Sequence, residues 1–256
     1  MHSRGFTLTE LIITLVVLAV LALGVSSYLG LGARMYSDVA IREQVLGQSR
    51  FAAERIVREL RNALPNSLQV SAANDCLSFA PVRYSGVYTQ APFDSAASSM
   101  TVISADLQAV SPVTFAAGQR PDVLIYPRNS SEVYAADAAS GARVALSQIQ
   151  TIDAATARFT LQFAQGAFRF LRQSPERRFY IVDAPVQYCA VPDGTGGFNL
   201  TRNGVLMAQG LVNNALFRVA EPTLNRNSVV NLFLQFGAQD NPDMFFNYEV
   251  HIANVP

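Results

Sequence analysis

A continuous apolar run near the N-terminus constrains this chain more than any other feature. Between Leu11 and Ala33 there are 23 residues without a charge, and no proline occurs before Pro65. At about 1.5 Å rise per residue, a helix of that length spans a hydrocarbon core of ~30 Å. The run is longer than the roughly 7–15 apolar residues of a secretory signal. We therefore predict a transmembrane helix, preceded by a short basic segment, residues 1–5.

After Ala33 the helical pattern continues but becomes amphipathic. Apolar residues recur at sums of three and four, which is one stripe of a helix: Met35, Val39, Leu46, Ala53, Ile56, Leu60 and Leu64. Charged residues occupy the other face. There the pairs Glu54–Arg58 and Arg55–Glu59 have i,i+4 spacing, which is worth a few tenths of a kcal/mol for each pair.

These patterns predict one helix of about 59 residues over Phe6–Leu64, near 88 Å long at ~1.5 Å per residue. Its first half, residues 6–33, is apolar all round. Its second half, residues 34–64, has one stripe that must pack on a globular domain. The alternative is an ordinary signal peptide that is cut before Val25. That alternative does not explain why the helix continues beyond the apolar run.

Beyond Pro65 the hydrophobic period changes from 3.6 to 2, the period of a half-buried strand. Four runs are rich in β-forming residues: Phe159–Phe163, Phe179–Val182, Val229–Phe236 and Phe246–Ile252. Asp193-Gly194 and Gly196-Gly197 indicate a turn that precedes a further strand. We therefore expect an α+β fold, in which an antiparallel sheet within residues 65–256 covers the lower half of the helix.

Two other stretches have weaker patterns. Residues from about 90 to 150 are rich in alanine and serine, and we interpret them as long loops with short strands, an insertion that carries system-specific contacts. Arg172, Arg177 and Arg178 form a small basic cluster around Pro175, which is typical of a charged loop.

The two cysteines, Cys76 and Cys189, lie 113 residues apart, each in a short β-like run. If the domain is in an oxidising compartment such as the periplasm, they are expected to pair. Closing a loop of this length stabilises a fold by at most about 4–5 kcal/mol. Two buried free thiols are the alternative.

Composition excludes several chemistries. Nineteen acidic residues balance nineteen basic ones, all of them arginine, so no net charge recruits nucleic acid. Without lysine, a P-loop with its usual lysine and a Schiff-base enzyme are excluded. His2, His251 and the two cysteines are too dispersed for a zinc site. His251 lies on the polar side of the last predicted strand, and no Gly-x-Ser-x-Gly elbow accompanies it. We expect no enzyme, metal or cofactor.

Glu10 is the charge that interrupts the apolar approach to the predicted span. A carboxylate at the edge of a membrane costs free energy unless it is paired or protonated, so such a residue is a functional hypothesis by default. It belongs to the stretch Arg4-Gly5-Phe6-Thr7-Leu8-Thr9-Glu10-Leu11. With the apolar helix that follows, this stretch resembles the class III signal of type IV pilins and type II secretion pseudopilins.

The resemblance implies that prepilin peptidase cuts between Gly5 and Phe6 and methylates the new amine of Phe6. Glu10 matches the family glutamate, five residues into the mature chain. Thr9 departs from the usual branched aliphatic residue. Ser27 stands where many major pilins have a helix-kinking proline, which favours a minor component over a major subunit.

The likeness extends beyond the signal. Three stretches of the predicted helix are similar to MshO-type minor pilins of the mannose-sensitive haemagglutinin (MSHA) type IV pilus: Gly24–Ala40, Gln48–Arg55 and Arg58–Asn66. Three later stretches are similar to PilW- and GspJ-type minor pilins and pseudopilins: Tyr188–Val191, Asn199–Arg202 and Met207–Val212. Residues 90–150 lie outside these similarities.

In a filament of such helices, an unpaired Glu10 carboxylate would cost several kcal/mol. The amine of Phe6 on a neighbouring subunit is the counter-charge that the resemblance suggests, and the pair would set the register between subunits. The alternative is a glutamate that sits among lipid headgroups without a role. The basic residues Arg34 and Arg42 lie beyond the span, on the side of the domain, whereas the positive-inside rule expects basic residues on the cytoplasmic side. We therefore place the domain in the periplasm on the basis of the cleavage site and not of charge.

The resemblance therefore implies a minor prepilin of an MSHA-like type IV pilus, held in the inner membrane and then in the pilus. Its expected partners are other minor and major pilins, prepilin peptidase, the inner-membrane assembly platform and the lipid bilayer. A type II secretion pseudopilin is the alternative within the same class. From another class, a pilus-tip adhesin would bind a glycan or a surface through the loops of residues 90–150 and 193–204.

Overall fold

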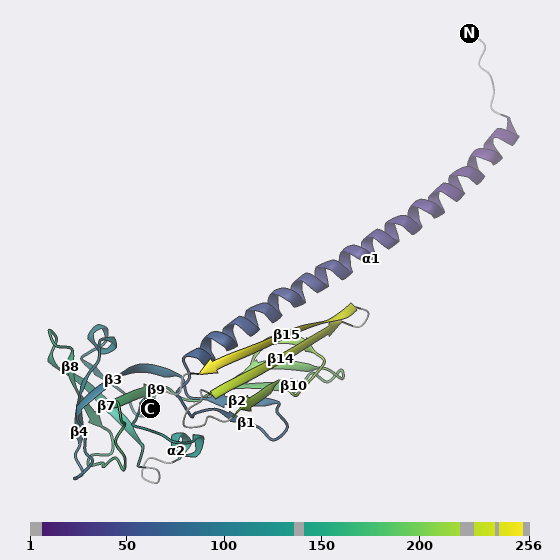
Figure 1. The fold of residues 1–256 in the computed structure, drawn as a ribbon. Coiled ribbons are helices and arrows are strands. Elements are labelled where there is room, and N and C mark those ends of the chain that lie inside the picture. Colours follow the sequence, from purple (N-terminus) through teal and green to yellow (C-terminus); the bar gives the residue numbers. More distant parts are fainter. Residues whose placement is uncertain (1–6, 136–140, 221–227, 239–240, 253–256) are drawn as a thin grey trace. The chain divides into compact units, whose positions relative to one another are not determined.

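The computed structural model describes residues 7–135, 141–220, 228–238 and 241–252 of the 256-residue chain. The chain forms two compact units, residues 1–47 and 48–256. Helix α1 (Leu8–Arg61, 54 residues) begins in the first unit and ends in the second (Figure 1). The expected long helix is confirmed, while its predicted first residue, Phe6, lies outside the described residues.

The helix ends three residues earlier than predicted, because its last turn tightens and the chain then joins a strand. Asn62 and Ala63 donate their N–H groups to carbonyls three residues back, and Leu64 donates to the carbonyl of Ala80 (2.8 Å). Pro65 also disfavours helical geometry at Leu64. The exit from α1 is therefore hydrogen-bonded to the globular unit.

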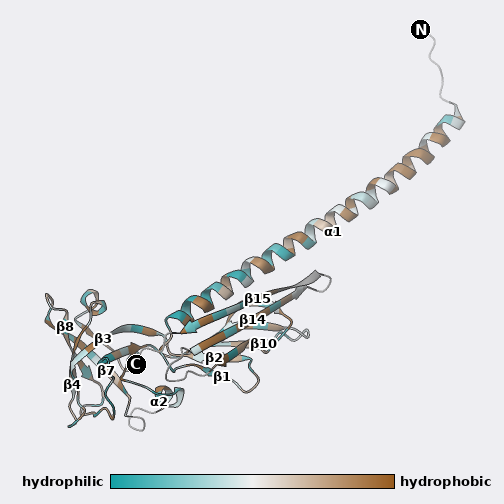
Figure 2. Ribbon diagram, in the orientation of Figure 1, coloured by the Kyte–Doolittle hydropathy of each residue, from teal (hydrophilic) through white to brown (hydrophobic). Residues whose placement is uncertain are grey.

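Burial along α1 begins at Ser49. Ala53, Ile56 and Leu60 are fully buried, as the predicted stripe requires, and Ser49 and Ala52 are buried beside them. The earlier members of the predicted stripe, Met35, Val39 and Leu46, are exposed. The packed part of the stripe is therefore shorter than the sequence pattern suggested. Figure 2 shows that the hydrophobic residues dominate the first half of α1 and alternate with hydrophilic ones in its second half.

The described residues of the globular unit form two antiparallel sheets instead of the single sheet that the alternation suggested. The first has the order β1-β2-β10-β11-β12-β14-β13, and β15 pairs with β14. Its strands are β1 (Gln69–Val70), β2 (Cys76–Phe79), β10 (Val186–Pro192), β11 (Phe198–Arg202), β12 (Val205–Leu211), β13 (Phe217–Ala220), β14 (Ser228–Ala238) and β15 (Asn241–Ile252). The long strands β14 and β15 lie side by side (Figure 1).

The second sheet has the order β5-β7-β6-β9-β3-β4-β8, and β7 also pairs with β8, so six strands close into a ring. Its strands are β3 (Val82–Gln90), β4 (Ser99–Ile103), β5 (Val113–Thr114), β6 (Asp122–Leu124), β7 (Arg143–Asp153), β8 (Arg158–Phe163) and β9 (Arg178–Val182). Because the sheet closes, the backbone N–H and C=O groups of strands that would otherwise lie at an edge are paired. The ring surrounds a core of apolar side chains that includes Phe159, Phe170 and Phe179.

The second sheet is an insertion between β2 and β10 of the first. Its strands run from Val82 to Val182, so it includes the alanine- and serine-rich segment that we expected to form mainly loops. The strands β4, β5 and β6 of that segment are short. Because β5 and β6 have only two and three residues, their alternation was too short to indicate membership of a closed sheet.

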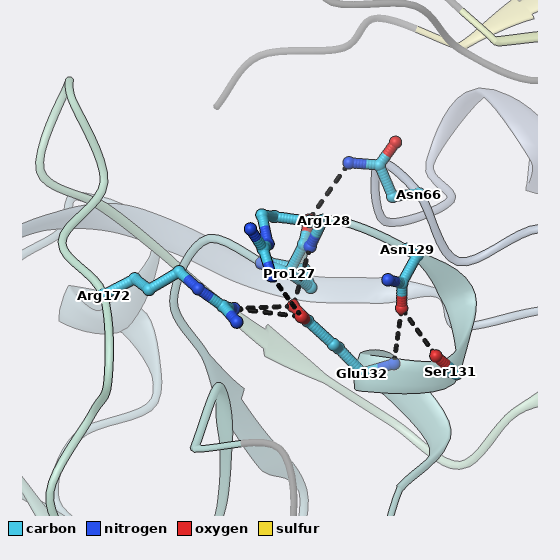
Figure 3. Close-up of polar contacts among 7 residues, drawn as sticks. All are labelled: Asn66, Pro127, Arg128, Asn129, Ser131, Glu132 and Arg172. Carbon is cyan, nitrogen blue, oxygen red and sulfur yellow. Dashed lines mark hydrogen bonds and ion pairs between the residues drawn. The ribbon is translucent and has the colours of Figure 1, made fainter.

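A polar cluster joins the helix exit to the insertion (Figure 3). The Asn66 side chain donates to the carbonyl of Pro127 (3.0 Å). Next to it, Asn129 caps the short helix α2 (Ser130–Tyr134) by accepting from the N–H of Glu132 (3.0 Å). The Glu132 carboxylate accepts from the Arg172 guanidinium at 2.9 and 3.0 Å. Arg172 is therefore an ion-pair partner, and not part of a purely solvated charged loop. A short 3-10 helix, η1 (Asp106–Ala109), is also present in the described part of the insertion.

Candidate functional site: the N-terminal helix and its anchorage

Thr7 and Glu10 form a reciprocal cap at the start of α1. The backbone N–H of Thr7 donates to the Glu10 carboxylate (3.0 Å), and so does the Thr7 hydroxyl (2.8 Å). In return, the N–H of Glu10 lies 3.4 Å from the Thr7 hydroxyl oxygen. This is a capping box, which satisfies N–H groups that have no partner within the helix. The pattern Thr-x-x-Glu could have been found in the sequence.

The capping box adds a second role for Glu10 to the one that the sequence suggested. A carboxylate at a helix N-terminus is also stabilised by the positive end of the helix dipole. Gly5 and Phe6, the predicted cleavage and methylation residues, lie outside the described residues. Glu10 is exposed at the first turn of α1.

The first part of α1 has an apolar surface on all sides. Leu8, Ile13, Leu18 and Leu23 are each more than 60% exposed, as are several of their neighbours. Among the described residues, α1 is the one helix long and apolar enough to cross a membrane. A helix that is apolar all round requires burial by lipid or by other helices. This part of the chain is therefore built for contact with a nonaqueous partner.

The opposite end of α1 is fastened to the first sheet through Glu59. One carboxylate oxygen accepts from Arg55 on the same helix (2.9 Å). The other accepts from Arg202 of β11 (3.0 Å) and from the Tyr188 hydroxyl of β10 (2.9 Å). The sequence had indicated Arg55–Glu59 as a pair on the charged face. The structure places that pair against the sheet and gives it two further partners.

Burial and hydrogen bonding shift the pKa of Glu59 in opposite directions. Partial burial raises the pKa of Glu59, but hydrogen bonds from Arg55, Arg202 and Tyr188 outweigh it, so the pKa lies below its ordinary value. Burial, followed by the nearby Glu59 carboxylate, raises the pKa of Tyr188. Glu59 is therefore a carboxylate and Tyr188 a neutral donor at neutral pH. This protonation pattern suits the hydrogen bond between them.

Cys76 and Cys189 meet at one rung between β2 and β10, and their sulfurs are bonded at 2.12 Å. These are the two strands that flank the inserted second sheet. The disulfide therefore closes a loop that contains the whole insertion, and it lies one residue from Tyr188 of the Glu59 cluster. Of the two alternatives left open by the sequence, paired cysteines or free thiols, the geometry contains the paired form.

Removing this bond is expected to destabilise the globular unit. For Cys76→Ser we expect the free energy of unfolding to fall by about 2–4 kcal/mol, because the unfolded chain regains the freedom of a 113-residue loop. Chemical denaturation of the detergent-solubilised chain measures the change. Cys189→Ser should give the same loss, and the double variant should add little to it. Equal stability of Cys76→Ser and the unreduced parent chain would contradict the prediction.

His251 has the exposed position on β15 that its place in the sequence suggested. Its imidazole lies 3.0 Å from the carboxylate of Glu249, its neighbour on the same face of the strand. Within the described ranges, no three His, Cys, Asp or Glu side chains gather as a metal site requires.

Comparison with known proteins bears on the N-terminus. Residues 1–26 match the prokaryotic N-terminal methylation motif. No curated protein and no solved structure matches the chain. The matched range includes Gly5, Phe6 and Glu10. The motif and the long apolar helix together support a type IV pilin-like protein with a membrane-anchoring N-terminal helix, and such a motif implies assembly with other pilins and processing by prepilin peptidase.

Proposed function

We propose that this chain is a minor prepilin that takes part in priming and assembling an MSHA-like type IV pilus. The observation that carries the proposal is the methylation motif over residues 1–26, which leads directly into the exposed apolar part of α1. The N-terminal helix would be stored in the inner membrane, with the two-sheet domain in the periplasm. A periplasmic location also fits the paired Cys76 and Cys189.

Assembly would move the apolar helix from lipid to a bundle of neighbouring pilin helices. Both environments bury the same apolar surface, so burial alone does not fix the register between subunits. An ion pair between Glu10 and the Phe6 amine of a neighbour would fix it, because every other register leaves a charge unpaired in an apolar medium. Removal of the leader, residues 1–5, is then a precondition for assembly, since cleavage creates that amine.

The capping box at Thr7 and Glu10 affects how the proposed ion pair with a neighbouring amine would form. In the unassembled chain, the Glu10 carboxylate already accepts two hydrogen bonds from Thr7. An incoming amine would therefore compete with, or add to, bonds within the same chain. The cap holds the carboxylate at the helix end, where an approaching amine can reach it.

The proposal is tested by the mature N-terminus of the chain. We expect mass spectrometry to find a methylated Phe6 as the first residue in cells with prepilin peptidase, and the uncut precursor in cells without it. Gly5→Val should leave at least about 90% of the chain uncut, because a branched side chain blocks the cleavage position. Ser3→Val, two residues earlier, is the matched control and should be processed normally. A chain that begins at Val25 would overturn the proposal.

A second measurement distinguishes the MSHA-like role from that of a type II secretion pseudopilin. Deleting the gene should reduce surface pili while leaving secretion of periplasmic enzymes intact. The reverse result would assign the chain to the secretion system. Both outcomes are compatible with processing at Phe6, so this test and the N-terminal one fail independently.

A further inference from the structure

We propose that the inserted second sheet carries a binding site for an acidic saccharide, in a groove beside β3 and β4. The groove has a volume of about 540 Å³, within the ~300–1,000 Å³ of small-molecule sites. It is formed by the end of β3, the connection to β4 and the turn before β9. The lining residues whose polar side chains could face a ligand are Gln90, Ser95, Ser99, Thr101, Gln173 and Arg177. The proposal does not depend on the proposed role in pilus assembly.

The walls of the groove are fixed by hydrogen bonds within the domain. Ala97 and Phe168 exchange both backbone hydrogen bonds, at 3.0 and 2.9 Å. The N–H of Phe170 donates to the carbonyl of Pro92 (2.8 Å). These bonds hold the connection between β3 and β4 against the core of the second sheet. A preformed site loses less conformational entropy when a ligand binds.

The turn that carries Arg177 is fixed in the same way. The Tyr88 hydroxyl is bonded to both backbone groups of Ser174, at 3.1 and 3.3 Å. The N–H of Tyr88 donates to the Arg177 carbonyl (2.8 Å), and Arg177 has a φ of 55°. A non-glycine residue with positive φ is uncommon. The turn therefore keeps Arg177 at the groove despite this backbone conformation.

A β-bulge shapes the floor of the groove. The pairing of β3 with β4 shifts register between Tyr88 and Gln90, which leaves Thr89 as the extra residue. Its hydroxyl donates to the carbonyl of Thr101 (3.2 Å). Bulges redirect the side chains beside them. Here Tyr88 is buried in the core, while Thr89 and Gln90 are exposed beside the groove.

The lining chemistry selects the class of ligand. Hydroxyl and amide groups offer hydrogen bonds to a molecule rich in hydroxyls, and the half-buried ring of Phe93 offers an apolar surface to one face of a sugar. Among the described residues that line the groove, Arg177 is the one charged side chain, and none of them is a carboxylate. A guanidinium is suited to bidentate binding of a carboxylate. These groups fit a saccharide that carries a carboxylate.

Nucleic acid fits this groove less well. Binding along a phosphate backbone requires several cations, one for each phosphate neutralised. The part of the lining that the structure describes provides a single arginine, and the chain has no net charge. One negative group and several hydroxyls are the better match.

The test measures saccharide binding by the full chain in detergent micelles. A glycan array with pairs of acidic and neutral saccharides identifies the ligand, and titration calorimetry with that saccharide gives the affinity. We expect acidic members to bind in preference to their neutral partners. Arg177→Gln should weaken this binding at least about tenfold, the loss expected for a charge-assisted hydrogen bond.

Arg169→Gln is the matched control, because Arg169 is an exposed arginine of the same inserted domain that does not line the groove. It removes the same charge and should bind within about twofold of the parent chain. Circular dichroism establishes that both variants are folded. Three results would overturn the proposal: no binding at millimolar saccharide, equal binding of neutral partners, or equal weakening by both substitutions. If the Arg177→Gln chain is still processed normally at Phe6, its weaker saccharide binding is not a consequence of failed maturation.

Discussion

Glu59→Ala is expected to lower the free energy of unfolding of the globular unit by about 2 kcal/mol. The substitution removes the acceptor shared by Arg55, Arg202 and Tyr188, so three donors at the boundary between α1 and the sheet lose their partner. The value is below the ~3–5 kcal/mol of a fully buried pair because solvent still reaches these side chains. Denaturant titration of the detergent-solubilised chain, followed by circular dichroism, measures it.

Glu54→Ala is the matched control for this prediction. Glu54 is paired with Arg50 on the same helix at 3.4 Å, and both side chains are well exposed. Exposed pairs of this kind contribute at most ~0.5 kcal/mol. Similar losses for the two variants would mean that the contacts of Glu59 with the sheet contribute nothing beyond its helical pairing.

The stabilisation by Glu59 should also depend on pH. Its pKa is lowered in the folded state, so the contribution is complete above the ordinary carboxyl pKa of 4.5 and is lost as pH falls through the lower folded value. The difference in stability between the parent chain and Glu59→Ala should therefore be constant near neutral pH and shrink in acid. A difference that grows in acid would contradict the assigned direction.

The sequence predicted the helix α1 and four of the strands, because the hydrophobic period of these segments is regular. The apolar run and stripe indicated α1, and alternation indicated β8, β9, β14 and β15. The Asp193-Gly194 turn is confirmed as the β10–β11 connection, where the Asp193 carboxylate accepts from the N–H groups of Thr195 and Gly197. Alternation does not specify the partner of a strand. The division into two sheets, and the ring closed by β7 and β8, were therefore not predictable from these patterns.

The polar contacts of α1 were only partly predictable for a similar reason. Arg55 and Glu59 are four residues apart, so helical spacing alone pairs them. Arg202 and Tyr188 reach the same carboxylate from positions 143 and 129 residues away from Glu59. No local sequence pattern predicts contacts between residues so far apart in the sequence. The capping box of Thr7 and Glu10 is local, so its Thr-x-x-Glu spacing can be read from the sequence alone.

Glu10→Gln is expected to reduce incorporation of the chain into pili at least about tenfold. Glutamine can serve in a capping box, so this substitution tends to keep the bonds with Thr7 while it removes the charge. If Glu10 acts as the counter-charge for an amine on a neighbouring subunit, the ion pair is lost in an apolar environment where it is strongest. Quantitative immunoblotting of sheared pili against whole cells measures the incorporated fraction.

Thr7→Ala is the complementary variant, because it removes the hydroxyl of the cap and leaves the Glu10 charge in place. Loss of a cap costs about 1 kcal/mol of helix stability, and a long helix held by its surroundings tolerates this loss. We therefore expect incorporation within about twofold of the parent chain. Mass spectrometry of the N-terminus establishes that both variants are processed. Normal incorporation of Glu10→Gln together with a defect in Thr7→Ala would reverse the assignment, because capping and not charge would then be the function of this residue pair.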